Sequence, residues 1–359
     1  MPRAEVRKKY TSYGSFGKRS FPLGVDACVV SILAPALNAS KSYSSWKNHK
    51  TAVSHVDKAQ RRFGVKLAIP FTENMVYAYV AYLRERGLQV ETIRQYMAAI
   101  RVEHLAQGHF PEALKPDLLE RICEGMKKLQ GQEKKKKERG PITLDRLLKL
   151  RDFLRGHYSA KSNRAAMWAA AAFMFWGSLR PGEALAEGQE RYNPASTLQM
   201  RDVRLKTVKV DGVELECLVV KLKCPKEARG DETEVEMMPN GSRSCPVKAW
   251  KHFLKTRTHK LRPSEPVFQW ADGRLIVASD VQSVLEECFQ DELGPREFLS
   301  CHSFRSGIAT ELARSGADDE TIMRQGRWKS SAFLCYVKLG RKERWQKQLA
   351  IAKRIAEQN

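Results

Sequence analysis

The sequence predicts a mainly α-helical protein with a small antiparallel β-sheet, divided into a helical N-terminal domain and a larger α+β domain. Apolar residues recur at helical spacings through most of the chain, whereas alternation of apolar and polar residues is confined to residues 208–237. A charged run at residues 131–140 separates two such patterned regions. The 359 residues are enough for two domains of ordinary size.

Net charge is the most unusual property of the composition. The 63 Lys and Arg residues exceed the 41 Asp and Glu residues, which gives a formal net charge of +22. This excess favours a polyanionic partner, with nucleic acid ahead of an anionic membrane surface. The longest apolar run, residues 165–177, is too short to cross a bilayer, so we expect no membrane partner. No apolar segment follows the basic N-terminus, so secretion is not expected.

Cysteine usage argues against two classes of small-domain scaffold. The eight cysteines are scattered and form no Cys-x-x-Cys pair. A zinc site and a disulfide framework are therefore not expected, and a reducing compartment fits the pattern. We accordingly expect no metal and no cofactor.

The first 40 residues are predicted to form a flexible basic arm. They mix Lys, Arg, Gly, Ser and Pro without a sustained period, and a partner would be needed to order them.

Residues 41–130 are predicted to form a helical DNA-binding domain. Four helices are expected to begin near Lys41, Thr72, Glu91 and Pro116, with Thr72 as an N-cap. Basic side chains lie between the apolar positions and are candidates for general DNA contacts: Lys47, Lys50, Arg61, Arg62, Arg94 and Arg101.

Residues 131–142 are predicted to be a basic linker. A solvated charge run, a linker lying along a phosphate backbone and an overlapping nuclear import signal all fit the four consecutive lysines. Residues 1–140 contain 26 basic and 13 acidic residues, so the smaller part of the chain is the more basic one. The lysines of this run are added to the candidate DNA contacts: Lys134, Lys135, Lys136 and Lys137.

The second domain is predicted over residues 143–340, with Thr143 as the first N-cap. The apolar run 165–177 is expected to be its central helix. A hairpin turning at Asp211-Gly212 and a further strand form the predicted sheet. The remaining helices are expected near residues 247–254, 279–289 and 304–315, with a C-terminal helix over 341–359 that docks on its own domain or on a neighbouring protomer.

Three segments of this domain carry candidate chemistry. The first contains Arg180 and, three residues later, Glu183. The second is a His302-x-x-Arg305 motif. The third begins at Gly326 and contains Trp328, 23 residues beyond Arg305. Its Tyr336 is the only tyrosine after residue 192. Each segment is a weak signal alone, whereas their order and spacing together form a specific pattern.

Together these motifs resemble the tyrosine recombinase and integrase family, whose active site contains Arg, Lys, His-x-x-Arg, His or Trp, and Tyr in that order. The resemblance covers about residues 41–340 and implies a clamp made of a helical core-binding domain and an α+β catalytic domain. The segments 245–249 and 326–336 look most like recombinases of Crypton and DIRS mobile elements. Trp328 and Tyr336 are eight residues apart, one fewer than in the commoner bacterial pattern.

The chemistry explains the residue types. Two guanidiniums can compensate the charge that develops on a phosphate under attack, and Arg180 and Arg305 are the candidates. His302 is suited to proton transfer or phosphate binding near neutral pH.

The resemblance implies that Tyr336 forms a covalent 3′-phosphotyrosine and that a loop lysine protonates the leaving 5′-oxygen. Further roles are assigned by position: the loop lysine is Lys226 or else Lys223, Trp328 offers an indole N–H and a packing surface, and Glu183 supports the site.

The function that the resemblance implies is site-specific DNA recombination without a metal, in transposon integration or excision. The implied partners are double-stranded DNA and further copies of the chain, as a dimer on one site and a tetramer in the synaptic complex. A type IB topoisomerase and a domesticated DNA-binding protein without catalysis are the alternatives. The expected compartment is the nucleus, or a bacterial cytoplasm.

Overall fold

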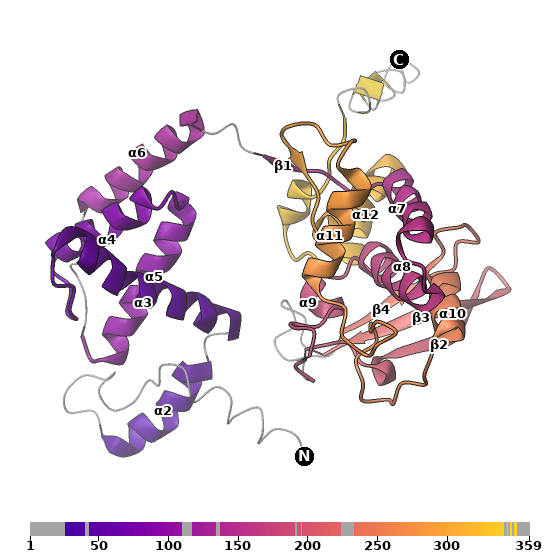
Figure 1. The fold of residues 1–359 in the computed structure, drawn as a ribbon, viewed down its shortest axis with the longest axis horizontal. Coiled ribbons are helices and arrows are strands. Elements are labelled where there is room, and N and C mark those ends of the chain that lie inside the picture. The colour runs from indigo at the N-terminus through magenta and orange to yellow at the C-terminus, as the bar shows by residue number, and fades with distance from the viewer. Residues whose placement is uncertain are drawn as a thin grey trace, which may run out of the picture. The chain divides into compact units, whose positions relative to one another are not determined.

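The structure is a computed structural model of the chain. It describes residues 26–39, 43–109, 117–133, 137–190, 192–194, 196–223 and 233–340, and residues 343, 345, 346, 348 and 349, with the backbone alone at 37–39, 43–47, 132 and 133. The chain divides into two compact units, Met1–Lys136 and Lys137–Asn359 (Figure 1). Each unit has its own hydrophobic core. None of the described helices has the length and apolar character that crossing a membrane requires.

The first unit is entirely helical in its described part. All four predicted helices are present, and Thr72 caps the second of them, since its Oγ1 accepts a hydrogen bond from the backbone N–H of Met75 at 3.4 Å. Tyr79 and Leu83 of this helix are buried with Ile93 of the next one. The elements are α2 (Ala27–Ala39), α3 (Tyr43–Phe63), α4 (Glu73–Glu85), α5 (Val90–Ala106) and α6 (Asp117–Glu133).

Helix α2 corrects the prediction of an arm without regular structure over residues 1–40. Its apolar residues form a nearly continuous run rather than a helical period, and Pro35 lies inside it. Proline removes a helix donor, so the local pattern argued against a helix. The rest of the predicted arm, residues 1–25, lies outside the described residues.

The predicted linker at 131–142 also needs correction. Its first residues belong to α6, and Glu138–Arg139 form strand β1, which pairs in parallel with β5 (Glu297–Phe298) of the second unit. The N–H of Gly140 continues this ladder to the carbonyl of Phe298 at 3.0 Å. A two-residue strand that pairs with a partner so distant in the sequence leaves no local pattern, which is why it was missed.

The second unit contains a three-stranded antiparallel sheet and, as predicted, a helix that begins after Thr143 and helices near residues 165–177, 247–254, 279–289 and 304–315. Most of the predicted C-terminal helix, residues 341–359, lies outside the described residues. The sheet order is β2-β3-β4, and the hairpin turns at Asp211 and Gly212, whose φ angles of 50° and 83° suit a two-residue turn. Helix α13 was not predicted. The elements are α7 (Leu144–His157), α8 (Lys161–Trp176), α9 (Pro181–Ala184), η3 (Met200–Asp202), β2 (Val203–Val210), β3 (Val213–Leu222), β4 (Thr233–Met237), α10 (Pro246–Thr256), α11 (Ala278–Phe289), α12 (Ser303–Arg314), α13 (Asp319–Gly326) and η4 (Ser331–Cys335).

Helix α8 is the centre of the second unit. Its residues 165–175 are all buried, as the apolar run predicted, and α7, α10 and α12 pack around it (Figure 1). Helix α12 lies so close to the segment before α7 that a Cβ at Gly307 would overlap the carbonyl of Ile142. This packing brings the end of α8 next to the start of α12.

Candidate active site

The turn after α8 presents Arg180. Helix α9 begins directly after Arg180, whose backbone N–H donates to Glu183 Oε2 at 2.8 Å, while its Nη1 donates to Glu183 Oε1 at 2.8 Å. The Arg180 side chain keeps 21% of its area exposed. Glu183 therefore holds Arg180 at both its backbone and its side chain, and the side chain of Arg180 is still partly exposed.

Arg305 lies beneath the site and joins three segments. Its side chain has no exposed area, and its guanidinium donates to the carbonyls of Ser178 and Gly326, the latter at 2.8 Å. Its guanidinium carbon lies 4.9 Å from the ring centroid of Trp328. Burial, followed by the nearby positive charges of Arg180 and Arg327, lowers the pKa of Arg305 to about 10. At that pKa the group stays a cation at neutral pH.

His302 precedes the first turn of α12 and is exposed. Partial burial lowers the pKa of His302, and the positive charges of Arg139, Arg305 and Arg180 lower it further. Its imidazole is therefore neutral at pH 7, the form that can accept a proton.

Trp328 and Tyr336 cover Arg305. Their rings lie 5.0 Å apart between centroids and 43° from parallel, and Trp328 is buried. A Cβ at Gly326 would overlap the Trp328 ring, so the close approach requires glycine there. The Thr310 hydroxyl of α12 donates to the carbonyl of Ser306 at 2.7 Å, and its Oγ1 also lies 3.5 Å from the carbonyl oxygen of Tyr336.

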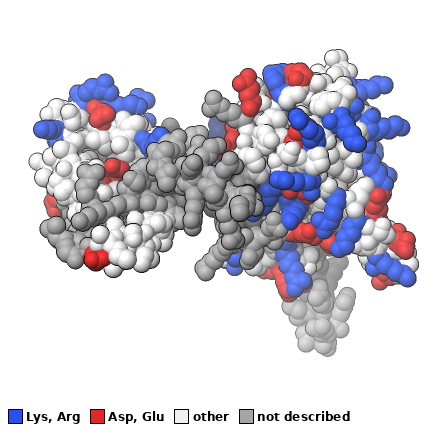
Figure 2. All heavy atoms as spheres, turned by 90° about the horizontal axis from the view of Figure 1, so that it is seen from below, with Lys and Arg blue, Asp and Glu red and all other residues white. Residues whose placement is uncertain are grey.

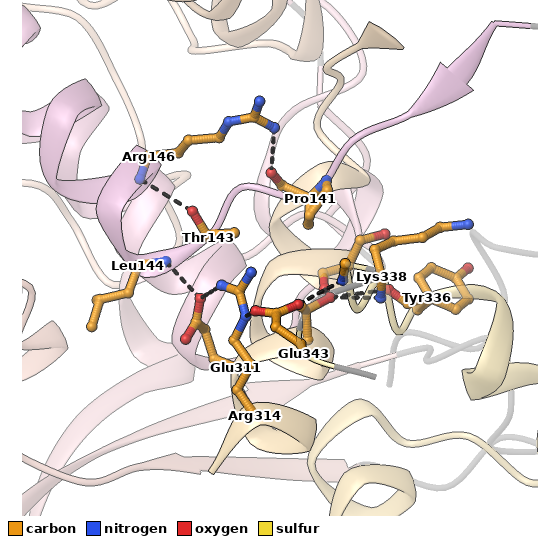
Figure 3. Close-up of polar contacts among 12 residues, drawn as sticks. Pro141, Thr143, Leu144, Arg146, Glu311, Arg314, Tyr336, Lys338 and Glu343 are labelled. Atoms are coloured by element: carbon orange, nitrogen blue, oxygen red, sulfur yellow. Dashed lines mark hydrogen bonds and ion pairs between the residues drawn. The ribbon is translucent and has the colours of Figure 1, made fainter. Parts of the chain in front are cut away.

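The segment that carries Tyr336 is tied to α12 at two further points (Figure 3). The backbone N–H of Lys338 donates to Thr310 Oγ1 at 2.9 Å. Arg314 Nε donates to Glu343 Oε1 at 2.6 Å, and the N–H of Gly340 donates to Glu343 Oε2 at 2.6 Å. The position of Tyr336 thus depends on contacts with α12 at and after the tyrosine.

The two candidate lysines differ in what the structure shows of them. Lys226 lies outside the described residues. Lys223, at the end of β3, has its Nζ 2.7 Å from Asp202 Oδ2, donates to the carbonyl of Pro194 at 3.0 Å and keeps 16% of its side chain exposed. Lys223 and Glu183 line the same small pocket. The carboxylate of Asp202 thus holds Lys223, which stands at the start of the segment that contains Lys226.

Most of the candidate DNA contacts outside this site whose side chains the structure describes are on the surface. Arg62 forms a bidentate pair with Glu85, at 2.9 and 2.7 Å, and Arg94 pairs with Glu120, which reduces the charge that these two offer to DNA. Figure 2 shows Lys and Arg side chains spread over the second unit among Asp and Glu. Of the others, Lys50, Arg61 and Lys137 are exposed, Arg101 is half-buried, and the side chains of Lys47, Lys134, Lys135 and Lys136 lie outside the described part.

Two residues of the site were missed by sequence reasoning. Arg327 Nη2 lies 2.8 Å from Glu183 Oε2, and Arg139 is an exposed cation whose charge acts on His302. Arg327 stands inside the Gly326 to Trp328 motif, so its position was a usable signal. No sequence signal marks Arg139, because only the pairing of β1 with β5 places it there. Among the described residues, no group of three or more His, Cys, Asp or Glu side chains is placed to hold a metal ion.

Comparison with known proteins supports the fold but not a closer relationship. No protein-family model matches the sequence, and no curated protein matches it either. The chain is similar to the XerH site-specific recombinase in a post-cleavage complex with palindromic difH substrate, with a TM-score of 0.57, 16% identity and coverage of 97% of this chain and 93% of that one. It is also similar to the Tn1549 transposon integrase with transposon right end DNA, with a TM-score of 0.54, 13% identity and coverage of 88% and 95%. A lambda integrase dimer bound to a COC′ core site gives a TM-score of 0.51, 15% identity and coverage of 85% and 93%.

Proposed function

The chain has the tyrosine recombinase and integrase fold, and we propose that it is a site-specific DNA recombinase that cleaves and rejoins strands through a 3′-phosphotyrosine intermediate. The observation that carries the proposal is the convergence of side chains from separate segments of the second unit on one site. These side chains are Arg180, His302, Arg305, Trp328 and Tyr336.

The reaction we propose begins with attack of Tyr336 Oη on a phosphorus atom of the DNA backbone. The bond from phosphorus to Oη forms, the bond from phosphorus to the 5′-oxygen breaks, and the phenol proton passes to a neutral base, a role that we propose for His302. Lys226 or Lys223 supplies the proton that leaves with the 5′-hydroxyl. Attack by another 5′-hydroxyl then reverses these steps on a new strand.

Arg180 and Arg305 differ in access to the phosphate. Arg180 is partly exposed and can bond a phosphate oxygen directly. Arg305 is covered by the rings of Trp328 and Tyr336. In our proposal the movement that carries Tyr336 Oη toward phosphorus also uncovers Arg305, so that nucleophile and second guanidinium reach the phosphate together.

The partners we propose are double-stranded DNA and further copies of this chain, as a dimer on one site and a tetramer during strand exchange. The structures of XerH, the Tn1549 integrase and a lambda integrase dimer contain DNA, which supports DNA as a partner of this chain. Trp345 and Leu349 near the C-terminus have exposed fractions of 61% and 58%, which suits docking on a neighbouring copy. The motif resemblance favours a mobile element of the Crypton or DIRS kind, and hence the nucleus.

A pool of nicked duplexes tests this function even though the target sequence is unknown. Duplexes with random sequence around one nick and a label at the 5′ end of the nicked strand lose a short leaving strand after cleavage, so the covalent adduct accumulates. We expect a labelled protein band with the wild-type chain, in EDTA, and none with Tyr336→Phe. Tight binding without any band would favour a DNA-binding protein without catalysis. Relaxation of supercoiled DNA by a monomer, without recombinant products, would favour a type IB topoisomerase.

A further inference from the structure

Arg327 has a backbone conformation that arginine rarely adopts. It follows the last residue of α13 with a φ angle of 55°, in the left-handed region. Glycine is the usual residue at this position after a helix, because a Cβ makes the conformation unfavourable. A side chain that stands here in spite of this cost calls for a compensating interaction.

The guanidinium of Arg327 supplies such interactions. Nη1 donates to the carbonyl of Gly177 at 2.9 Å, and Nη2 donates to the carbonyl of Ser178 at 3.1 Å and to Glu183 Oε2 at 2.8 Å. Only 12% of the side chain is exposed. Ser178 is itself left-handed, with a φ angle of 46°. Arg327 therefore bonds the turn after α8 at three acceptors, one of which is the carboxylate that holds Arg180.

Glu183 lies between two guanidiniums. Its Oε1 accepts from Arg180 Nη1, and its Oε2 accepts from both the backbone of Arg180 and the side chain of Arg327. Without Arg327, the carboxylate would lose its link to the Trp328 loop and could rotate together with Arg180. Because Arg327 directly precedes Trp328, the same contacts also hold the Trp328 loop against the Arg180 turn.

We propose that Arg327 is a positioning residue for Arg180, acting through Glu183 and the carbonyls of residues 177 and 178. The inference rests on the proposed function, in which Arg180 binds the scissile phosphate. Arg327 fixes the distance between the guanidinium that meets the phosphate and the loop that leads to the nucleophile.

Four full-length variants test this role. Arg327→Gly removes the guanidinium and relaxes the backbone, Arg327→Ala removes the guanidinium and keeps the Cβ, and Arg327→Lys keeps the charge. Arg324→Ala is the matched control, since it removes an exposed arginine from α13, the helix that Arg327 follows. The readouts are thermal unfolding, the amide exchange rate of Arg180, and the single-turnover rate of adduct formation on duplexes recovered from the nicked pool.

For Arg327→Gly we expect only a small drop in melting temperature, because relief of the left-handed backbone strain offsets part of the lost hydrogen bonds. We also expect unchanged DNA affinity, faster exchange at the Arg180 amide, and an adduct rate about 10- to 100-fold lower, the cost of displacing a contact to the reacting group by about 1 Å. Arg327→Lys should recover part of the rate. Two further variants, Glu183→Gln alone and Glu183→Gln combined with Arg327→Gly, test whether the two residues act together. The decrease in rate that Glu183→Gln causes should be smaller in the Arg327→Gly background than in the wild-type chain, because both changes break the same contact between Arg327 and Glu183.

Wild-type exchange and rate in Arg327→Gly would overturn the proposal. Faster exchange throughout the second unit with a large drop in melting temperature would also overturn it, in favour of a purely structural role. If the wild-type chain forms no adduct but Arg327→Gly still speeds exchange at Arg180, the positioning contact stands and the proposed function fails.

Discussion

Arg305 lies beneath the ring of Tyr336, with its guanidinium carbon 5.8 Å from the ring centroid. The candidate nucleophile thus packs on a cation that is fully buried and whose donors hold the carbonyls of Ser178 and Gly326. Arg305 is therefore part of the fold as well as of the candidate chemistry, whereas Arg180 is at the surface of the same site.

This difference predicts unequal effects of two similar substitutions. Arg305→Ala removes the donor of the Gly326 carbonyl, one of the two donors of the Ser178 carbonyl and a fully buried side chain, so we expect a loss of about 3 kcal/mol in the free energy of unfolding of the second unit. Arg180→Ala removes a partly exposed pair and should cost about 1 kcal/mol or less, yet both variants should form no adduct. Urea unfolding followed by tryptophan fluorescence checks this, because six of the seven tryptophans belong to the second unit. Equal losses of stability in the two variants would contradict the conclusion that Arg305, and not Arg180, is part of the fold.

The pH dependence of cleavage should report His302. Partial burial and the charges of Arg139, Arg305 and Arg180 lower the pKa of His302 below its ordinary value of 6.5. If the neutral imidazole accepts the phenol proton, the adduct rate is full above about pH 6.5 and falls as the pH drops through the lowered pKa.

Arg139→Gln removes the largest electrostatic cause of that shift. We expect the pKa of His302, measured by NMR of labelled histidine, to rise toward 6.5, and the acid limb of the rate profile to move to higher pH with it. Arg262→Gln, which removes an exposed arginine 82% accessible at its side chain, is the control and should move neither. A His302 titration that is unchanged in Arg139→Gln would show that β1 does not place Arg139 near the imidazole.

The contact between Arg314 and Glu343 predicts a local effect on the nucleophile segment. Because the pair is partly exposed, Glu343→Ala should cost less than about 1 kcal/mol of global stability. The amides of Lys338 and Gly340 should nevertheless exchange faster, and adduct formation should slow several-fold. Glu320→Ala removes a more exposed pair of α13 and serves as the control. Unchanged exchange at Gly340 in Glu343→Ala would rule out this tether.

Stability of the helical unit should depend on His104. His104 is fully buried, with Nε2 accepting from the backbone N–H of Phe71 at 2.8 Å and Nδ1 facing the carbonyl of Ile100 at 2.8 Å. This arrangement fits the neutral ring, and burial lowers the pKa of His104 below 6.5. The unfolded chain then binds the proton more readily, so the stability from neutral His104 is complete above about pH 6.5 and is lost as the pH falls from there toward the lowered pKa.

Pulse proteolysis in urea can measure this loss, since the two units give fragments of different size. The stability difference between the wild-type chain and His104→Gln should shrink as the pH is lowered from 7.5 to 5. A difference that stays constant over this range would contradict a neutral, buried His104.

The sequence predicts features that depend on local interactions and misses those that depend on distant contacts. Thr72 and Thr143 cap helices where the sequence places them, because a cap is a local interaction. Strand β1 and α2 escaped prediction, since the first depends on a distant partner and the second contains Pro35. The same limit applies to the site. The spacing of His302 and Arg305 predicts a shared helix face, but only the packing of Trp328 and Tyr336 shows that one is exposed and the other fully buried.

The most direct test of the central claim is to identify the atom that carries the DNA. The gel-purified adduct would be digested with nuclease and trypsin and analysed by mass spectrometry. Cleavage after Lys329 and Lys338 isolates the peptide 330–338. We predict a nucleotide joined through its 3′-phosphate to Tyr336 of this peptide. We also predict that the bound strand has a free 5′ end, which a 5′-to-3′ exonuclease can digest. A nucleotide on any other residue, or a strand attached through its 5′ end, would contradict our account.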